Sequence, residues 1–281
     1  MQCTVTIKFF IIFTIFANAC NKDKQEENPF DVQPVLYPVT TGVIDEASGL
    51  ADSYANAGFL WVNEDSDNPT HLYLLGHDGK HGKNIFVANA TNRDWEEMMV
   101  GAGPVAGKKY IYIGDIGDNS RKYDEYYIYR FEEPAASVDT VKQVDRITFK
   151  YPDGAHDAEA FYMDTAKDIY IVTKRDAKSK VYRLPYPQNT SGLVTAEFVM
   201  DLPYSGVVGA AYSARGELLI KTYSNIYYYS RGNPAGSYLT LPYQVELQGE
   251  AVGFANDGTG FYTLSEKGLG SAVNLRFYKR K

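Results

Sequence analysis

The feature that most constrains the fold is a short unit that recurs five times along the chain. Each copy opens with small residues, usually beside an acidic one, enters an apolar run, and reaches a second apolar run that ends in polar residues. The openings lie at residues 46–50, 94–99, 157–162, 208–212 and 248–253, and the second runs lie at 59–65, 110–115, 169–173, 218–222 and 261–266. A period of about 39 to 63 residues indicates one supersecondary element repeated in space.

The segments between the openings predict short strands joined by turns, and no long amphipathic helix is evident. Four strands per unit are typical of a β-propeller. The last unit has only three strands of its own, whereas residues 35–40 form a strand that belongs to no unit. We therefore predict an all-β fold over residues 34–281, a single propeller with five four-stranded blades. The N-terminal strand should close the ring by pairing in the last blade.

The N-terminus has the pattern of a bacterial lipoprotein. Lys8 is the only charged residue before an apolar run at 9–17, which is too short to span a bilayer and ends in Ala-Asn-Ala-Cys20. This resembles a lipobox, and the resemblance implies a signal peptide at 1–19, a lipidated Cys20 and a flexible tether at 20–33. The alternative is an ordinary signal peptide with an incidental cysteine. The charged tether resembles the surface-export signal of Bacteroidetes lipoproteins.

Composition excludes several classes of partner and chemistry. The net charge of −7 disfavours a nucleic acid or an anionic lipid surface as a partner. Cys3 would leave with the signal peptide and lipid would occupy Cys20, so cysteine catalysis is excluded. The sequence has no phosphate-binding loop, nucleophile elbow or dinucleotide fingerprint. We expect a monomer that contacts the membrane through its lipid anchor, on the periplasmic or the cell-surface side of the outer membrane.

A first set of acidic residues stands where the inner strands begin. Side chains two apart on a strand point the same way, so Asp94 with Glu96, and Asp157 with Glu159, should form same-side pairs near the channel. These four residues are the candidates for general acid and base catalysis. The alternative is structural, because carboxylates at such positions also hold neighbouring backbone amides.

A second set follows the second strand of each unit and should rim the same mouth of the channel. Its members mix acids with cations and a tyrosine, which predicts a polar ligand pocket; with one inner-strand acid, the ligand-binding candidates are Asp65, Asp115, Lys174, Arg175, Tyr223, Glu250 and Glu266. The alternative is a solvated rim with ordinary salt bridges.

The Gly-Asp-Ile-Gly-Asp-Asn-Ser-Arg stretch at 114–121 is dense in carboxylate and amide oxygens. Asp115, Asp118 and Asn119 are therefore candidate ligands for Ca²⁺, although the spacing of an EF-hand loop is missing. The alternative is a rigid turn built on Asp and Asn side chains. Beyond this Ca²⁺ we expect no cofactor.

The 114–121 loop, the Asp-Ala-Glu-Ala segment at 157–160, the Thr-Lys-Arg-Asp segment at 173–176 and the Gln-Gly-Glu-Ala segment at 248–251 together resemble one family of secreted or lipid-anchored bacterial propellers. More distantly the chain is similar to phytase-like and esterase-like bacterial propellers. That similarity implies an ester or phosphoester hydrolase, although no catalytic residue matches one by one. Five-bladed glycosidases also place carboxylates at inner-strand starts.

Three functions follow from these patterns. The first is a lipid-anchored envelope protein that binds a small polar ligand, such as a carbohydrate, at its acidic mouth. The second is a glycoside or phosphoester hydrolase that uses the channel carboxylates. The third is a scaffold for protein interaction. Carboxylate pairs about 5–5.5 or 6.5–9.5 Å apart across an open pocket would favour glycoside hydrolysis, and carboxylates capped by backbone amides would favour a structural role.

Overall fold

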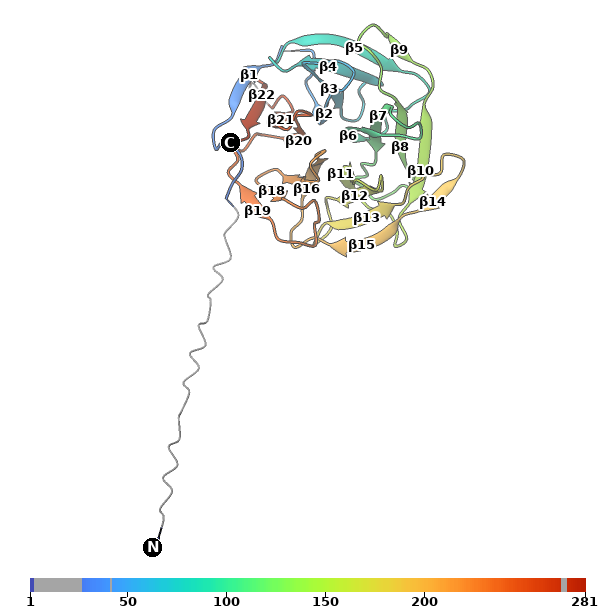
Figure 1. Cartoon of the computed structure of the whole chain (residues 1–281). Coiled ribbons are helices and arrows are strands. Elements are labelled where there is room, and N and C mark those ends of the chain that lie inside the picture. The colour runs from blue at the N-terminus through green and yellow to red at the C-terminus, as the bar shows by residue number, and fades with distance from the viewer. Residues whose placement is uncertain (3–26, 41, 269–271) are drawn as a thin grey trace.

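The computed structural model of the chain describes residues 1–2, 27–40, 42–268 and 272–281, and shows five sheets arranged in a ring around a central axis (Figure 1). We call the region along this axis the channel. Most of the predicted signal peptide, including its apolar core, and the predicted lipidation site Cys20 lie outside the described residues. The described part of the chain contains no helix long and apolar enough to cross a lipid bilayer. The predicted all-β propeller of five blades is confirmed.

Each blade runs outward from the channel as an antiparallel sheet, and its strands follow one another along the chain. Blade 1 is β2 (Ala47–Asp52), β3 (Phe59–Glu64), β4 (His71–Gly76) and β5 (His81–Val87); blade 2 is β6 (Trp95–Ala102), β7 (Lys109–Asp115), β8 (Tyr126–Glu132) and β10 (Asp145–Lys150); blade 3 is β11 (Ala158–Met163), β12 (Ile169–Thr173), β13 (Lys180–Leu184) and β15 (Glu197–Asp201). Blade 4 is β16 (Val207–Tyr212), β17 (Leu218–Thr222), β18 (Ile226–Tyr229) and β19 (Leu239–Leu241).

Blade 5 is completed by the N-terminal strand, as predicted. Its own strands are β20 (Gly249–Phe254), β21 (Gly260–Ser265) and β22 (Asn274–Lys279), and β1 (Val35–Pro38) pairs antiparallel with β22 (Figure 1). Upstream, Phe30 forms a bridge with Arg280 and buries its ring against Tyr228 and Phe261. Both ends of the described propeller thus meet in one blade, which removes the open edge that an unclosed ring would expose.

Two blades carry a short fifth strand that the sequence did not predict. β9 (Thr140–Val141) comes from the long insertion of blade 2 and pairs parallel with β5 of blade 1. β14 (Leu193–Thr195) precedes the outer strand of blade 3 and pairs parallel with β10 of blade 2. Each strand therefore ties its own blade to the preceding one at the outer edge.

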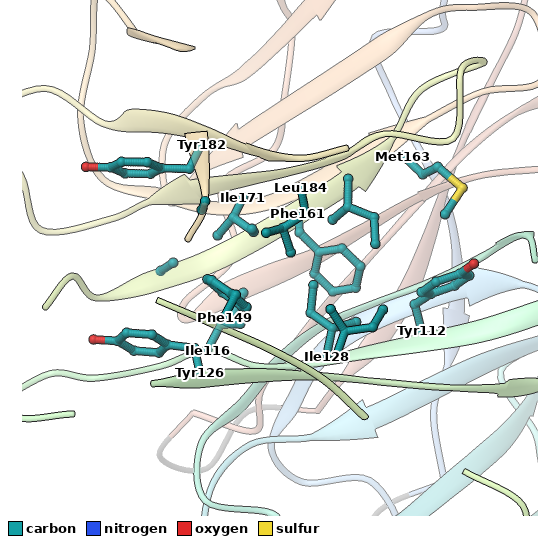
Figure 2. Packing of buried hydrophobic residues seen from close by; sticks show 14 of the residues in the cluster. Tyr112, Ile116, Tyr126, Ile128, Phe149, Phe161, Met163, Ile171, Tyr182 and Leu184 are labelled. Carbon is teal, nitrogen blue, oxygen red and sulfur yellow. The ribbon is translucent and has the colours of Figure 1, made fainter. Parts of the chain in front are cut away.

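The hydrophobic core is divided among the interfaces between blades. Five clusters of buried apolar side chains lie between the five neighbouring pairs of blades. In the cluster between blades 2 and 3, Phe161 packs among aliphatic side chains, with Tyr126 and Tyr182 on one side and Tyr112 and Met163 on the other (Figure 2). Because strands of a propeller blade bury both faces, these strands are apolar at successive positions rather than at alternate ones.

Candidate functional site: the acidic mouth of the channel

A β-bulge occurs at the same place in all five inner strands. In each of β2, β6, β11, β16 and β20 the register with the second strand shifts by one residue near the start of the strand. The extra residues are Ser48, Glu96, Glu159, Val208 and Glu250. A bulge bends its strand and turns the extra side chain out of the regular pleat. We call these five residues the bulge ring.

Three of the five bulge-ring residues are carboxylates, and they converge at one end of the channel. Glu96, Glu159 and Glu250 each offer an oxygen that lies within 4.8 Å of the other two, and each side chain is nearly inaccessible to solvent. Ser48 donates its hydroxyl to Glu96 at 3.2 Å and lies 3.4 Å from an oxygen of Glu250. The ring is thus lined by three carboxylates and one hydroxyl, and Val208 supplies its only apolar member.

One cation serves these carboxylates directly. The Lys174 ammonium group forms a short ion pair with Glu159, lies 3.8 Å from Glu250 and donates to the Tyr223 hydroxyl at 3.1 Å. Tyr223 in turn donates a short hydrogen bond to Glu250. The other oxygen of Glu159, Oε2, is buried and has no partner among the described residues. Lys174 follows β12 and Tyr223 follows β17, so equivalent positions of blades 3 and 4 act together.

A second group of carboxylates surrounds the bulge ring nearer to solvent. Asp65, Asp94 and Glu96 also offer oxygens within 4.8 Å of one another. Glu266 follows β21, as Asp65 follows β3, and accepts a hydrogen bond from Gln248 at 2.7 Å. Glu46 completes this group at an exposed position and accepts a hydrogen bond from Asn68 at 2.6 Å. We call this end of the channel the acidic mouth.

Crowding of negative charge raises the pKa of these carboxyl groups. Burial, and then the neighbouring negative charges, raise the pKa of Asp94 to about 6 and that of Glu266 to about 7. Burial and the charge of Glu159 hold the pKa of Glu96 well above its usual value. The pKa of Glu159 is raised in the same direction, by burial first and by Glu250 next, although Lys174 opposes the shift.

Burial alone would lower the pKa of Lys174, but the carboxylates of Glu159 and Glu250 more than reverse this effect, and the pKa lies above its ordinary value. Lys174 is therefore a permanent positive charge at physiological pH. The carboxyl groups of the acidic mouth outnumber Lys174 and Lys221, the two ammonium groups that act on Glu250, so their negative charge is only partly balanced.

Other predicted site residues are engaged in hydrogen bonds and ion pairs that hold neighbouring loops together. Asp157 is fully buried, accepts the backbone N–H of Asp118 at 2.9 Å and pairs with Arg175 at 2.7 Å. It is therefore not among the carboxylates that converge, although Glu159 two residues later is. The second partner of Arg175 is Asn119, whose amide oxygen accepts a short hydrogen bond.

The candidate calcium loop is likewise held by its own hydrogen bonds. Both oxygens of Asp118 accept from the protein: Oδ1 from the N–H of Lys122 at 2.9 Å, and Oδ2 from the N–H of Tyr123 and the hydroxyl of Tyr126, each at 2.9 Å. Asp115 is fully buried and accepts the N–H of Asp94 at 2.8 Å. These contacts stabilise the loop. Of the four carboxylate oxygens of Asp115 and Asp118, the buried Oδ2 of Asp115 alone has no hydrogen-bond partner among the described residues, so the two side chains do not form an ion site by themselves.

Two functional features were missed in the sequence. Ser48 stands in the first opening but carries no charge, and Glu97 follows Glu96 on what looked like the outer side of the strand. Glu97 is fully buried and accepts the N–H of Met98 at 3.0 Å and the N–H of Ala210, in blade 4, at 2.8 Å. Its carboxylate therefore spans the channel from blade 2. The aligned openings, 46–50 with 94–99 and 157–162, were the available signal.

Comparison with known proteins gives the fold. No protein-family model matches the sequence, and no curated protein does. Among solved structures, a glucose dehydrogenase is 12% identical over 88% of this chain and 100% of its own, with a TM-score of 0.53. A second glucose dehydrogenase is 13% identical over 88% and 99% of the two chains, with a TM-score of 0.50, and a streptogramin B lyase is 11% identical over 90% and 99%, with a TM-score of 0.47. At these identities the shared property is the β-propeller fold alone.

Proposed function

We propose that this protein is a binding protein that holds a divalent cation at the acidic mouth and, through the cation, a small polar ligand such as a carbohydrate. The observation that carries this proposal is the convergence of three bulge-ring carboxylates, Glu96, Glu159 and Glu250, within 4.8 Å. Buried like charges at this separation are unfavourable unless protons or a cation neutralise them. Three oxygen donors from rigid strands are suited to a hard cation such as Ca²⁺.

The charge balance of the mouth supports a cationic guest. The acidic mouth holds more carboxylates than cations: its carboxylates are Glu46, Asp65, Asp94, Glu96, Glu159, Glu250 and Glu266. Lys174 contacts Glu159 and Glu250. The buried ammonium group of Lys221, which donates to the carbonyl of Gly249, also acts on Glu250. Arg175 is already paired with Asp157. These three cations are therefore already engaged by the protein, and the excess of negative charge would repel an anionic ligand.

The number of oxygen ligands that the cation needs supports the binding of a small molecule beside the protein's own carboxylates. Ca²⁺ takes about six to eight oxygen ligands. The three bulge-ring carboxylates, with the Ser48 hydroxyl beside two of them, provide only part of this number. The remaining positions would face the mouth, where Asp65 and Asp94 are only half-buried. Hydroxyl groups of a sugar or polyol are the uncharged oxygens that would fill them.

A second candidate function is hydrolysis, and one observation favours it. Asp94 has a pKa of about 6, near the value useful for general acid–base catalysis, and its carboxylate approaches Asp65 and Glu96. The oxygens of Glu96 and Glu159 lie closer together than the separations of about 5–5.5 and 6.5–9.5 Å that accompany retaining and inverting glycosidases. Turnover of nitrophenyl glycosides or phosphates that Asp94→Asn abolishes would support this candidate instead.

The envelope location belongs to the same proposal. We infer lipidation at Cys20 from the sequence pattern, with the propeller displayed beyond a short tether. Metabolic labelling with a palmitate analogue, compared between the native chain and Cys20→Ala, measures this directly. Equal labelling of both chains would refute it.

Calorimetric titration tests the cation site. The chelator-treated protein should bind one equivalent of Ca²⁺ and gain melting temperature, because the cation binds only the folded ring. Glu159→Gln should lose most of this response. Glu132→Gln is the matched control, since Glu132 is exposed and pairs only with Lys108 on the surface. A Ca²⁺ response that survives Glu159→Gln, or its absence in the native protein, would refute the proposed site.

A further inference from the structure

The opposite end of the channel holds a cavity of about 250 Å³ that the acidic mouth does not use. All five inner strands contribute to its wall over their C-terminal halves, beginning about 7–10 Å along each strand from the bulge ring. Its lining is mainly apolar, with Met98, Met99, Met163, Tyr162, Tyr212 and Phe254 among the larger side chains. We call this region the apolar cup. Met163 lies at the edge of the interface between blades 2 and 3 (Figure 2).

The cup is separated from the acidic mouth by a narrow level of the channel. There Glu97 reaches from blade 2 to the backbone of Ala210 in blade 4. The strands also approach closely: a Cβ atom on Gly49 would lie 2.5 Å from the backbone nitrogen of Met98, and one on Gly209 would lie 2.5 Å from the carbonyl oxygen of Glu250. Both positions therefore require glycine. Met98 and Ala210 are buried on the cup side of this level.

One wall of the cup is a stack of flat rings. Tyr162 lies parallel to Tyr212, with ring centroids 6.0 Å apart and an interplanar angle of 6°, and parallel to Tyr170 at 5.1 Å and 10°. Tyr162 and Tyr212 both line the cavity. Parallel rings and flexible methionine side chains together suit a flat or thin apolar guest. A cavity of about 150 Å³ lined by aliphatic and aromatic groups is enough for benzene, so the cup has room for a substituted ring.

The edge of the cup carries two carboxylates and two ammonium groups, and both carboxylates already accept hydrogen bonds from the protein. Asp52 is already engaged, since it accepts from His77 at 2.8 Å and from the N–H of Asn256 at 2.7 Å. Asp164 is likewise engaged by the N–H groups of Ala166 and Asp168, at 2.9 and 3.0 Å.

The two ammonium groups at the edge are available for a guest. Lys109 lies 3.9 Å from the ring centroid of Tyr54, and Lys167 lies 4.7 Å from that of Tyr186. Within the described part of the chain, neither has a carboxylate within ion-pair distance. The donors left for a guest are therefore cationic.

We propose that the apolar cup is a second binding site, specific for a small apolar monocarboxylate. Its aliphatic or aromatic body lies against Tyr162, Tyr212 and the methionines, and its carboxylate points outward to Lys109 and Lys167. Burial of the body supplies most of the affinity. The ammonium groups at the edge supply the preference for an acid over a neutral or cationic analogue.

The test uses three probes with one apolar body: 4-phenylbutyrate, 4-phenylbutanol and 4-phenylbutylamine. Titration into the purified full-length protein, followed by calorimetry, should give saturable binding of the acid about fivefold tighter than the alcohol, with the amine weakest. Lys109→Met should reduce the preference for the acid in part, because Lys167 remains, and should leave the affinity for the alcohol unchanged. Lys109→Met combined with Lys167→Met should reduce the affinity for the acid to that for the alcohol. Lys108→Met is the control, because Lys108 is adjacent in sequence but pairs with Glu132 and does not line the cavity.

A second variant tests the position of the site. Met99→Glu places a carboxylate in the lining, at a half-buried position that tolerates a polar group, and should abolish binding of the acid. Glu159→Gln, at the acidic mouth, should leave it unchanged, so failure of the cation site does not affect this result. The proposal is overturned if no probe saturates, if the acid is not preferred, or if Lys109→Met and Lys108→Met behave alike.

Discussion

The two ends of the channel are built from the same five strands but have opposite chemistry. At the acidic mouth the strands begin with a bulge, and three of the five bulge residues are glutamates buried against one another. At the apolar cup the same strands run in regular register and end in Met, Tyr, Phe and Ala side chains around a cavity. A regular pleat divides its residues between two interfaces, whereas a bulge directs one side chain toward the axis.

This difference shows how a propeller can carry two sites without mixing them. Carboxylates that share one small space raise each other's pKa, so they are stable only with bound protons or a bound cation. An apolar wall next to these carboxylates would exclude water from them and so raise the free-energy cost of keeping them ionised. Between the two ends, the channel is occupied by closely packed backbone at Gly49 and Gly209 and by the carboxyl group of Glu97, which accepts two backbone hydrogen bonds.

The largest loss of stability should come from removing Glu97, which lies between the acidic mouth and the apolar cup. Glu97→Ala removes the acceptor of two buried N–H groups, those of Met98 and Ala210, and leaves a cavity. Unsatisfied buried donors cost about 1–3 kcal/mol each, so we expect a loss of about 3 kcal/mol in the free energy of unfolding. Urea titration followed by tryptophan fluorescence measures this. Glu97→Gln keeps one acceptor and should lose about half as much; an alanine variant as stable as the native protein would contradict the role assigned to Glu97.

The next effect sharpens the description of the apolar cup. Met163→Ala removes a side chain that lines the cavity and packs against the cluster between blades 2 and 3, so we expect a loss of about 2 kcal/mol. The enlarged cup should accept a wider body, so that 4-(1-naphthyl)butyrate gains affinity relative to 4-phenylbutyrate. Calorimetric titration of both acids checks the change in their ratio. An unchanged ratio would show that Met163 does not contact the acid in the cup.

The pH dependence of stability should distinguish the acidic mouth. The folded-state pKa is about 6 for Asp94 and about 7 for Glu266, both above the ordinary values. The folded protein therefore holds protons that the unfolded chain has released, and its stability falls as pH rises from about 4 to about 7. Both side chains are partly open to solvent, so screening reduces the effect, to about 1–2 kcal/mol together.

Thermal melting between pH 4 and pH 8 measures this loss. Saturating Ca²⁺ should remove most of it, because the cation replaces the protons in neutralising the mouth. If the loss of stability is the same with and without Ca²⁺, the titrating carboxyl groups are not the groups that bind the cation. Asp94→Asn should weaken the pH dependence, and Asp78→Asn, which changes an exposed aspartate in a turn between strands, should not.

The sequence was sufficient to predict the fold and the end of the channel at which Glu96, Glu159 and Glu250 lie. The period of the unit indicated five blades, and the unpaired strand at 35–40 indicated how the ring closes. Openings at equivalent positions of equivalent blades meet at one end of the channel, and the structure places Glu96, Glu159 and Glu250 together there.

The bulge is what the sequence did not reveal. Alternation predicts that Asp157 and Glu159 face the same way, but the extra residue in β11 separates them, and Asp157 turns to Arg175 and a backbone amide. The apolar cup was equally hidden, because it needs no motif. It forms where the ends of five strands approach a common axis, and no single strand end, such as Met98–Ala102, carries a sequence motif that would reveal it.

The smallest effect should come from Ser48, the one hydroxyl of the bulge ring. Ser48→Ala removes the hydroxyl that donates to Glu96 at 3.2 Å and lies 3.4 Å from Glu250, and should cost about 1 kcal/mol without a cation. With Ca²⁺ bound the cost should change little if the hydroxyl only orients the carboxylates, and should grow if it also contacts the ion. Comparing the Ca²⁺ affinities of Ser48→Ala and the native protein separates these cases. Ser191→Ala, in an exposed turn, is the control, and a Ser48→Ala protein indistinguishable from it in both stability and affinity would remove Ser48 from the site.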